Sequence, residues 1–139
     1  MDIAKTRIEF ERGFEMSLDI NQTFQEKIRA IFTRNEWDSK QFCDQTGLEP
    51  IMFSRMNQPG YTPNMRTLTA VCMALKLDVP TTEDLLKSVG LAFSPVNRVH
   101  RAYVYLLENC KDVSIEDCNT ILTSFGIGRN DLLGTIQRK

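Results

Sequence analysis

Four cysteines and a single histidine are the side chains in this 139-residue sequence that could bind a transition metal. They stand at Cys43, Cys72, His100, Cys110 and Cys118. Zinc sites usually begin with two such ligands only about two to four residues apart, and the sequence has no such pair. We therefore expect free thiols on apolar helix faces, with no metal site and no cofactor.

The sequence lacks the residue combinations that catalysis needs. With one histidine in the chain, we find no pairing of a nucleophile with a base. There is also no glycine-rich phosphate loop and no recognisable pair of catalytic carboxylates. We do not expect an enzyme, and the chemistry that remains is recognition.

Charged side chains are the first candidates for recognition. The net charge is −1, which argues against a protein covered in phosphate-binding charge. It still allows one local basic face, because a partner responds to the local field. Five basic residues could form such a face or could simply lie on solvated helix surface: Arg29, Arg34, Lys40, Arg55 and Arg66.

The composition is typical of a globular protein. A hydrophobic fraction of 42% with 25% charged residues is enough for a buried core. The length fits one compact domain, or a core domain with a helical extension. No apolar stretch resembles a secretion signal or approaches the roughly 18 residues of a membrane helix. Together with the dispersed cysteines, this predicts a cytoplasmic protein with no membrane partner.

Residues 1–22 have the pattern of a β-hairpin arm. Apolar residues recur at a period of two on either side of Gly13. They are Ile8, Phe10, Phe14, Met16, Leu18 and Ile20. A three-residue loop over Arg12–Phe14 places Phe10 and Met16 on one face, whereas a two-residue loop splits the apolar set. We therefore predict the three-residue loop.

Beyond this arm the period becomes helical, and the predicted fold class is mainly α. Short polar residues mark helix starts at Thr23, Asp38, Asn64 and Ser114. Two further helices are predicted to begin near Thr82 and at Ser94–Pro95. Nine apolar residues are predicted to share one core: Phe24, Ile28, Phe42, Leu48, Phe53, Met56, Leu68, Val71 and Leu75.

The stretch from Trp37 to Met56 has the pattern of a helix-turn-helix motif. A short helix ends at Gly47, one apolar residue follows, and Pro50 suits the first position of a second short helix. Glycine at the turn permits the left-handed backbone that lets two helices cross steeply.

Two stretches, WDSKQFCDQTGLEPIMFSRM and TPNMRTLTAVCMALKLDVPTTEDLL, resemble the Cro/repressor-type (XRE-like) helix-turn-helix family. The resemblance implies a five-helix domain over residues 23–93. Further runs, YVYLL at residues 103–107 and DLLG at residues 131–134, are similar to a subgroup with a helical C-terminal extension. We expect residues 94–139 to be that extension, packed on the domain.

In this family the second helix of the motif enters the major groove of DNA. The resemblance implies that bases are read by Glu49, Pro50, Ile51, Met52 and Arg55. It implies that phosphates are contacted by Ser39, Lys40, Tyr61 and Asn64. The sequence departs from the family pattern at the helix tip, since bases are usually read by Arg, Lys, Asn or Gln.

Two functions follow as expectations. The first is a DNA-binding transcriptional regulator that acts as a homodimer on double-stranded DNA, because two recognition helices then meet two half-sites. The alternative is a protein–protein interaction module that keeps the helix-turn-helix fold, with Ile51 and Met52 as its apolar contact patch. Both side chains are expected on the solvent side of the helix.

Overall fold

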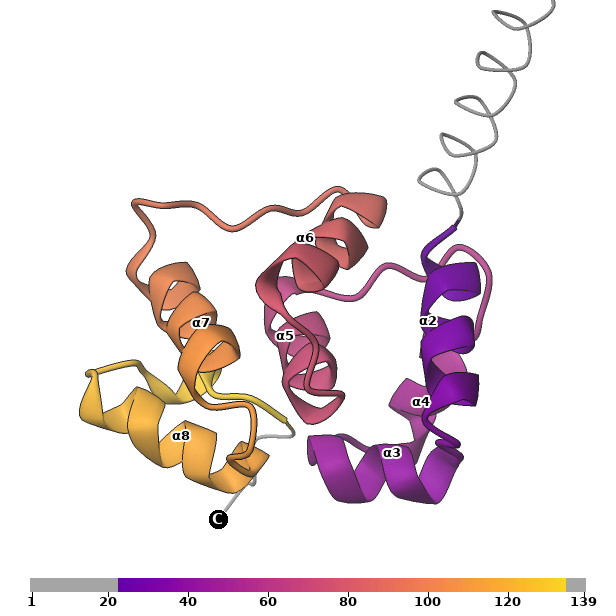
Figure 1. The fold of residues 1–139 in the computed structure, drawn as a ribbon, viewed down its shortest axis with the longest axis horizontal. Coiled ribbons are helices and arrows are strands. Elements are labelled where there is room, and N and C mark those ends of the chain that lie inside the picture. Colours follow the sequence, from indigo (N-terminus) through magenta and orange to yellow (C-terminus); the bar gives the residue numbers. More distant parts are fainter. Residues whose placement is uncertain (1–22, 135–139) are drawn as a thin grey trace, which may run out of the picture.

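The computed structural model describes residues 23–134, and this part of the chain is mainly helical (Figure 1). Seven α-helices fill the described range, with no strand among them. In chain order they are α2 (Phe24–Arg34), α3 (Ser39–Thr46), α4 (Pro50–Met56), α5 (Met65–Ala74), α6 (Val79–Ser88), α7 (Arg98–Asn109) and α8 (Ile115–Ser124), followed by a 3-10 turn, η1 (Arg129–Asp131). The predicted hairpin arm, residues 1–22, lies outside the described residues.

Side-chain caps determine where four of these helices begin, as predicted. The Thr23 hydroxyl and the Asp38 carboxylate each accept a hydrogen bond from a backbone N–H three residues later. Asn64 does the same at the start of α5, at 2.8 Å, and Ser114 at the start of α8, at 3.1 Å. Each cap satisfies an N–H that the helix itself leaves without a partner.

The predicted start of α6 near Thr82 is wrong, because the helix begins earlier, at Val79. Its cap is Asp78, whose carboxylate accepts a hydrogen bond from the Thr81 N–H at 2.9 Å. Pro80 lies in the first turn, where a missing N–H costs no helical hydrogen bond. The Thr82 hydroxyl instead donates to the Asp78 carbonyl inside the helix.

The predicted start of α7 at Ser94–Pro95 is also wrong. The cap is Asn97, and the helix begins at Arg98. The backbone N–H of Ser94 donates to Nδ1 of His100 at 2.9 Å, which holds the preceding chain as a loop folded against the first turn. This contact also gives the only histidine of the chain a structural role.

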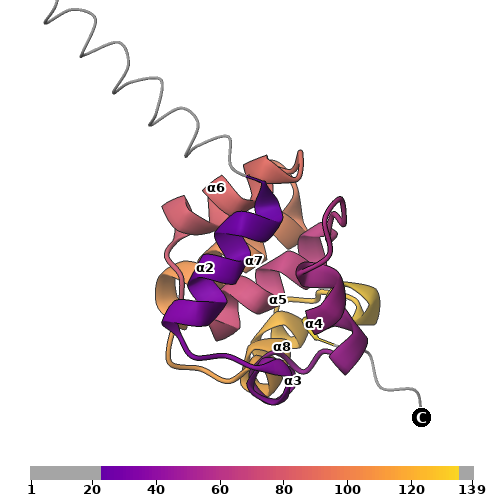
Figure 2. The same cartoon turned by 90° about the vertical axis from the view of Figure 1, so that its right-hand side faces the viewer.

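Helix α5 is the centre of the described domain. It contacts α3, α6, α7 and α8, and it lies in the middle of the ribbon (Figures 1 and 2). Six consecutive residues from Leu68 to Met73 are buried, so the helix is apolar on nearly all sides. One connected core therefore extends from Phe24 in α2 to Leu133 after η1.

Eight of the nine predicted core residues are buried, and the exception is Phe53, which is half-buried. Its ring still belongs to an aromatic cluster formed by Phe32, Trp37, Phe42 and Phe53. The ring centroids of Phe42 and Phe53 are 5.4 Å apart, and those of Phe32 and Phe53 are 5.5 Å apart. This cluster joins α2 to α3 and α4.

The chain after α8 is held by polar side chains. The Tyr103 hydroxyl of α7 donates to the Asp131 carbonyl at 2.5 Å. The Asn119 side chain of α8 donates to the Leu133 carbonyl at 2.8 Å and accepts from the Leu133 N–H at 2.7 Å. A segment with little regular structure therefore has a defined path across α7 and α8.

Candidate functional site

The turn between α3 and α4 is short and fully specified. Gly47 ends α3 with φ of 72°, in the left-handed region that glycine adopts without strain. The buried Thr46 hydroxyl donates to the Phe42 carbonyl at 2.6 Å and accepts from the Leu48 N–H at 3.1 Å. Leu48 then points into the core, and α4 begins at Pro50. The sequence prediction of two helices around Gly47 is correct at this level.

Helix α4 has an inner and an outer side. Met56 is completely buried on the inner side, and Phe53 packs beside it. Ile51 and Arg55, four residues apart, lie on the outer side, where Ile51 is 52% exposed. Ser54 is also exposed. The α3–turn–α4 packing thus presents one side of α4 to solvent.

Met52 does not belong to the outer side, and the expectation that it faces solvent is wrong. It is half-buried and packs against the core, because it lies four residues before the buried Met56 on the same helix face. Its sulfur is 3.9 Å from Nη1 of Arg55, so the methionine supports the arginine side chain. Ser54, which the sequence prediction omitted, shares the outer side with Ile51, and helical spacing alone could have identified it.

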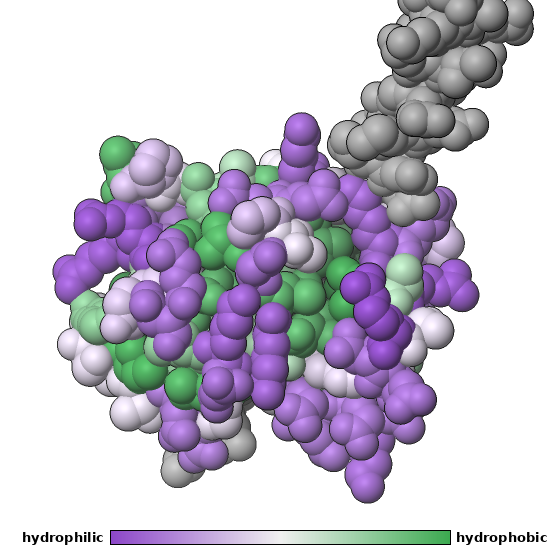
Figure 3. All heavy atoms as spheres, in the orientation of Figure 1, coloured by the Kyte–Doolittle hydropathy of each residue, from purple (hydrophilic) through white to green (hydrophobic). Residues whose placement is uncertain are grey.

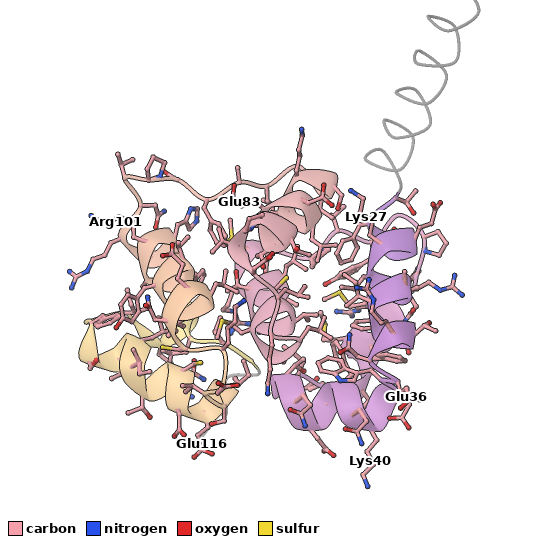
Figure 4. The ribbon with its side chains drawn as sticks, in the orientation of Figure 1. Lys27, Glu36, Lys40, Glu83, Arg101 and Glu116 are labelled. Atoms are coloured by element: carbon pink, nitrogen blue, oxygen red, sulfur yellow. The ribbon has the colours of Figure 1, made fainter. Side chains whose placement is uncertain are left out.

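The other predicted contact residues surround α4 unevenly. Glu49 and Pro50 are exposed at its N-terminus, and Glu49 makes no capping hydrogen bond. Lys40 on α3 is exposed and points away from the body of the molecule (Figure 4). Ser39, at the first position of α3, is half-buried.

Tyr61 and Asn64 belong to the loop that leads from α4 into α5. Asn64 is exposed, and its side-chain oxygen is engaged in capping α5. Tyr61 is half-buried, and its carbonyl accepts a hydrogen bond of 2.7 Å from the side chain of Gln25. Gln25 is buried in α2, so this hydrogen bond attaches the loop to α2. No local pattern could have predicted this contact, because it joins residues 36 positions apart.

Acidic and basic groups alternate around the exposed side of α3 and α4. Lys40 and Arg55 are exposed cations, and Asp44 and Glu49 are exposed anions. The Asp38 carboxylate already occupies the N-terminus of α3. The local charge is therefore mixed, as the overall charge of −1 is.

Arg66 is not part of an exposed basic face. It is half-buried on α5, and its guanidinium donates to the carbonyls of Leu132 and Gly134 at 3.2 and 3.1 Å. Of the five basic residues considered as a face, the other four are exposed: Arg29, Arg34, Lys40 and Arg55.

Gly134 brings the C-terminal segment against the α3–α4 turn. Its Cα is 3.8 Å from the position that a Cβ on Gly47 would take. A Cβ on Gly134 itself would lie 2.9 Å from the Thr46 carbonyl oxygen, closer than side chains approach backbone. Arg66 and Gly134 therefore attach the end of the described chain to the turn that orients α4.

The four cysteines belong to the helical core or pack against it. Cys72, Cys110 and Cys118 are buried and Cys43 is half-buried, and all four are free. Burial raises the pKa of the Cys72 thiol to about 12 and that of Cys118 to about 11. Within residues 23–134, no three side chains of the metal-binding types come together. Over the same range, no helix is long and apolar enough to span a bilayer.

Comparison with known proteins gives no relative for this chain. No protein-family model matches it, and neither curated proteins nor solved structures include a match.

Proposed function

We propose that this protein is a DNA-binding regulator of the Cro/repressor-like helix-turn-helix class, with α4 as the recognition helix. In this proposal α2 to α6 are the five helices of the domain. Helix α3 crosses the DNA backbone and α4 lies in the major groove.

The observation that carries the proposal is the exposed outer side of α4. Ile51, Ser54 and Arg55 are uncovered by any described part of the chain, although α4 is anchored firmly on its other side. A helix of this length presented by a neighbouring helix and a three-residue turn fits the width of the major groove. Arg55 can reach a guanine or a phosphate, Ser54 can bond to a base edge, and Ile51 can contact a thymine methyl group.

Binding to a random pool of short duplexes tests the proposal directly. Fluorescence anisotropy across a range of salt concentrations measures how many phosphates the protein neutralises. We expect measurable binding at low salt, with a shallow salt dependence because only Lys40, Arg55 and few other cations surround α4. No binding at low salt would contradict the proposal.

Arg55→Ala identifies the surface used. If Arg55 contacts a phosphate, the slope of log affinity against log salt should fall by about one. If it reads a guanine, affinity for the preferred site should fall by about 1–3 kcal/mol. Lys111→Ala is the matched control, because Lys111 is an exposed cation in the loop after α7 and should change neither quantity.

A second candidate function is a protein–protein interaction module that uses the same surface. It is favoured by the exposed Ile51 and by the carboxylates of Asp44 and Glu49, which repel phosphate. Ile51 would then be the central apolar anchor, a kind of residue whose loss often costs about 2 kcal/mol or more.

The two candidates differ in their response to Ile51→Ser. The substitution should leave stability and affinity for random duplexes nearly unchanged, because Ile51 is exposed and contacts no phosphate. It should abolish recovery of a protein partner in a quantitative pull-down, while Arg55→Ala retains that partner. Equal recovery with both variants would exclude α4 as the protein contact.

A further inference from the structure

The outer side of α7 carries four residues that no described contact of the core uses. Arg101, Val104, Tyr105 and Glu108 have helical spacing and share the side opposite the buried residues. The buried side consists of Ala102, Tyr103, Leu106 and Leu107. Arg101 points away from the rest of the molecule (Figure 4).

Apolar groups form the middle of this side. Tyr105 is 47% exposed, and its ring packs edge-to-face on Phe125 of the α8 C-cap at 5.4 Å. Phe125 is itself 36% exposed. Alongside lies an open groove of about 460 Å³, lined by the α7 residues together with Phe93 and Pro95. Figure 3 shows apolar surface among the polar side chains over α7 and α8.

The charges at the two ends of this side are opposite. Arg101 and Glu108 are seven residues apart, which is about 10.5 Å along a helix, so they cannot pair within α7. Both are exposed, and neither forms an ion pair with another residue in the described part of the chain. The midpoint between them falls between Val104 and Tyr105.

We propose that α7 is a homodimer interface in which α7 packs antiparallel against α7 of a second copy. The arrangement of charges is self-complementary, as a twofold interface requires. With the twofold axis between Val104 and Tyr105, Arg101 meets Glu108 of the second copy, and Glu108 meets its Arg101. The exposed Tyr105 and the half-buried Val104 then lie at the centre of the interface.

This dimer does not depend on the proposed DNA function, although it suits it. Helices α7 and α4 lie at opposite ends of the molecule (Figure 1). Pairing through α7 therefore leaves the outer side of α4 uncovered in both copies. Two such helices are what a palindromic DNA site would need.

Charge reversal tests the interface on the full chain without DNA. Multi-angle light scattering and sedimentation equilibrium measure the mass over a series of protein concentrations. Arg101→Glu places like charges together at two symmetric positions, and so does Glu108→Arg. We expect each variant to weaken the dimer by at least about tenfold, because like charges across an interface are strongly unfavourable.

The decisive sample is an equimolar mixture of these two variants. Each copy of Arg101→Glu can meet a copy of Glu108→Arg with opposite charges at both positions, so heterodimers should form at wild-type strength. The double variant should also recover dimerisation. Glu83→Arg, on the exposed surface of α6, is the control and should have no effect.

Three outcomes would overturn the proposal. One is a monomeric wild-type protein at high micromolar concentration. Another is a dimer that both single reversals leave unchanged. The third is a mixture that remains monomeric while wild type dimerises. Circular dichroism of each variant checks that it is folded. The masses are measured without DNA, so the dimer can be confirmed or excluded even if the protein fails to bind DNA in a separate assay.

Discussion

The two ends of the described chain are held in place by different kinds of contact. At the α2–α4 end, the aromatic cluster formed by Phe32, Trp37, Phe42 and Phe53 fills the space between three helices. At the other end, the segment after α8 follows hydrogen bonds from Tyr103, Asn119 and Arg66 to its backbone. Burial of rings stabilises in proportion to area, whereas backbone tethers depend on exact positions.

The two kinds of contact meet at the α3–α4 turn. The cluster fixes α3 and α4 from inside, and Gly134 contacts the turn from the other side. The orientation of α4 thus depends on both. Substitutions that affect only one of them can separate their contributions.

The largest expected effect lies in the cluster. Phe42→Ala should lower the free energy of unfolding by about 3–5 kcal/mol, because the ring is completely buried and leaves a cavity. Phe53→Ala should cost roughly half as much, since that ring is only half-buried. Urea unfolding measures both. Equal losses in the free energy of unfolding would contradict the prediction that the buried Phe42 ring contributes more stability than the half-buried Phe53 ring.

The next effect concerns the tethered end. Gly134→Ala should cost about 2–4 kcal/mol, because φ is 81° and the new Cβ meets the Thr46 carbonyl oxygen. Gly60→Ala is the matched control: φ is 84° there, but no atom lies within 4 Å, so about 1–2 kcal/mol is expected. If the two variants unfold alike, the contact with the turn contributes nothing.

The smallest effect is a loss of stability at alkaline pH. The buried Cys72 thiol stays protonated in the folded protein up to a pKa of about 12, whereas the unfolded chain releases this proton above its ordinary value of 9.0. Ionisation therefore stabilises only the unfolded state between these values, and the free energy of unfolding falls as pH rises above 9. Below pH 9 the thiol contributes no pH dependence.

For Cys72 this loss amounts to about 2 kcal/mol at a pH near 10.5. Denaturant unfolding at pH 8 and at the alkaline value should show a smaller decline for Cys72→Ala than for wild type. The substitution also leaves a cavity that lowers stability at both pH values, and comparing the pH-dependent declines in the free energy of unfolding removes this constant contribution. Parallel curves would mean that the thiol ionises in the folded protein as well.

Much of the fold could be predicted because helix starts depend on local interactions. Thr23, Asp38, Asn64 and Ser114 each bond to an N–H three residues away, so short sequences specify them. The starts of α6 and α7 were misplaced where two polar candidates compete within a few residues. At α7, a contact between Ser94 and His100 decided between them.

The candidate site was only partly predictable. Ile51 and Arg55 are exposed as the resemblance implied, but Met52 is half-buried because its neighbour four residues later anchors α4. The sequence predicted Met56 in the core, and helical spacing then places Met52, four residues earlier, on the same side, which the resemblance to a recognition helix did not take into account. The packing of α4 against the core decides how deeply Met52 and Phe53 are buried, and both are half-buried.

The sequence by itself determined the helical class, the caps at Thr23, Asp38, Asn64 and Ser114, the Gly47 turn and nearly all of the core, because these depend on local hydrogen bonds and apolar spacing. The tertiary structure alone decided the role of Arg66, which binds carbonyls 66 and 68 residues away. It also decided the contact of Gly134 with the turn. Such long-range contacts between a side chain and backbone leave no periodic pattern in the sequence. Before folding brings the segments together, nothing near Arg66 or Gly134 distinguishes it from an arginine or glycine on the solvated surface.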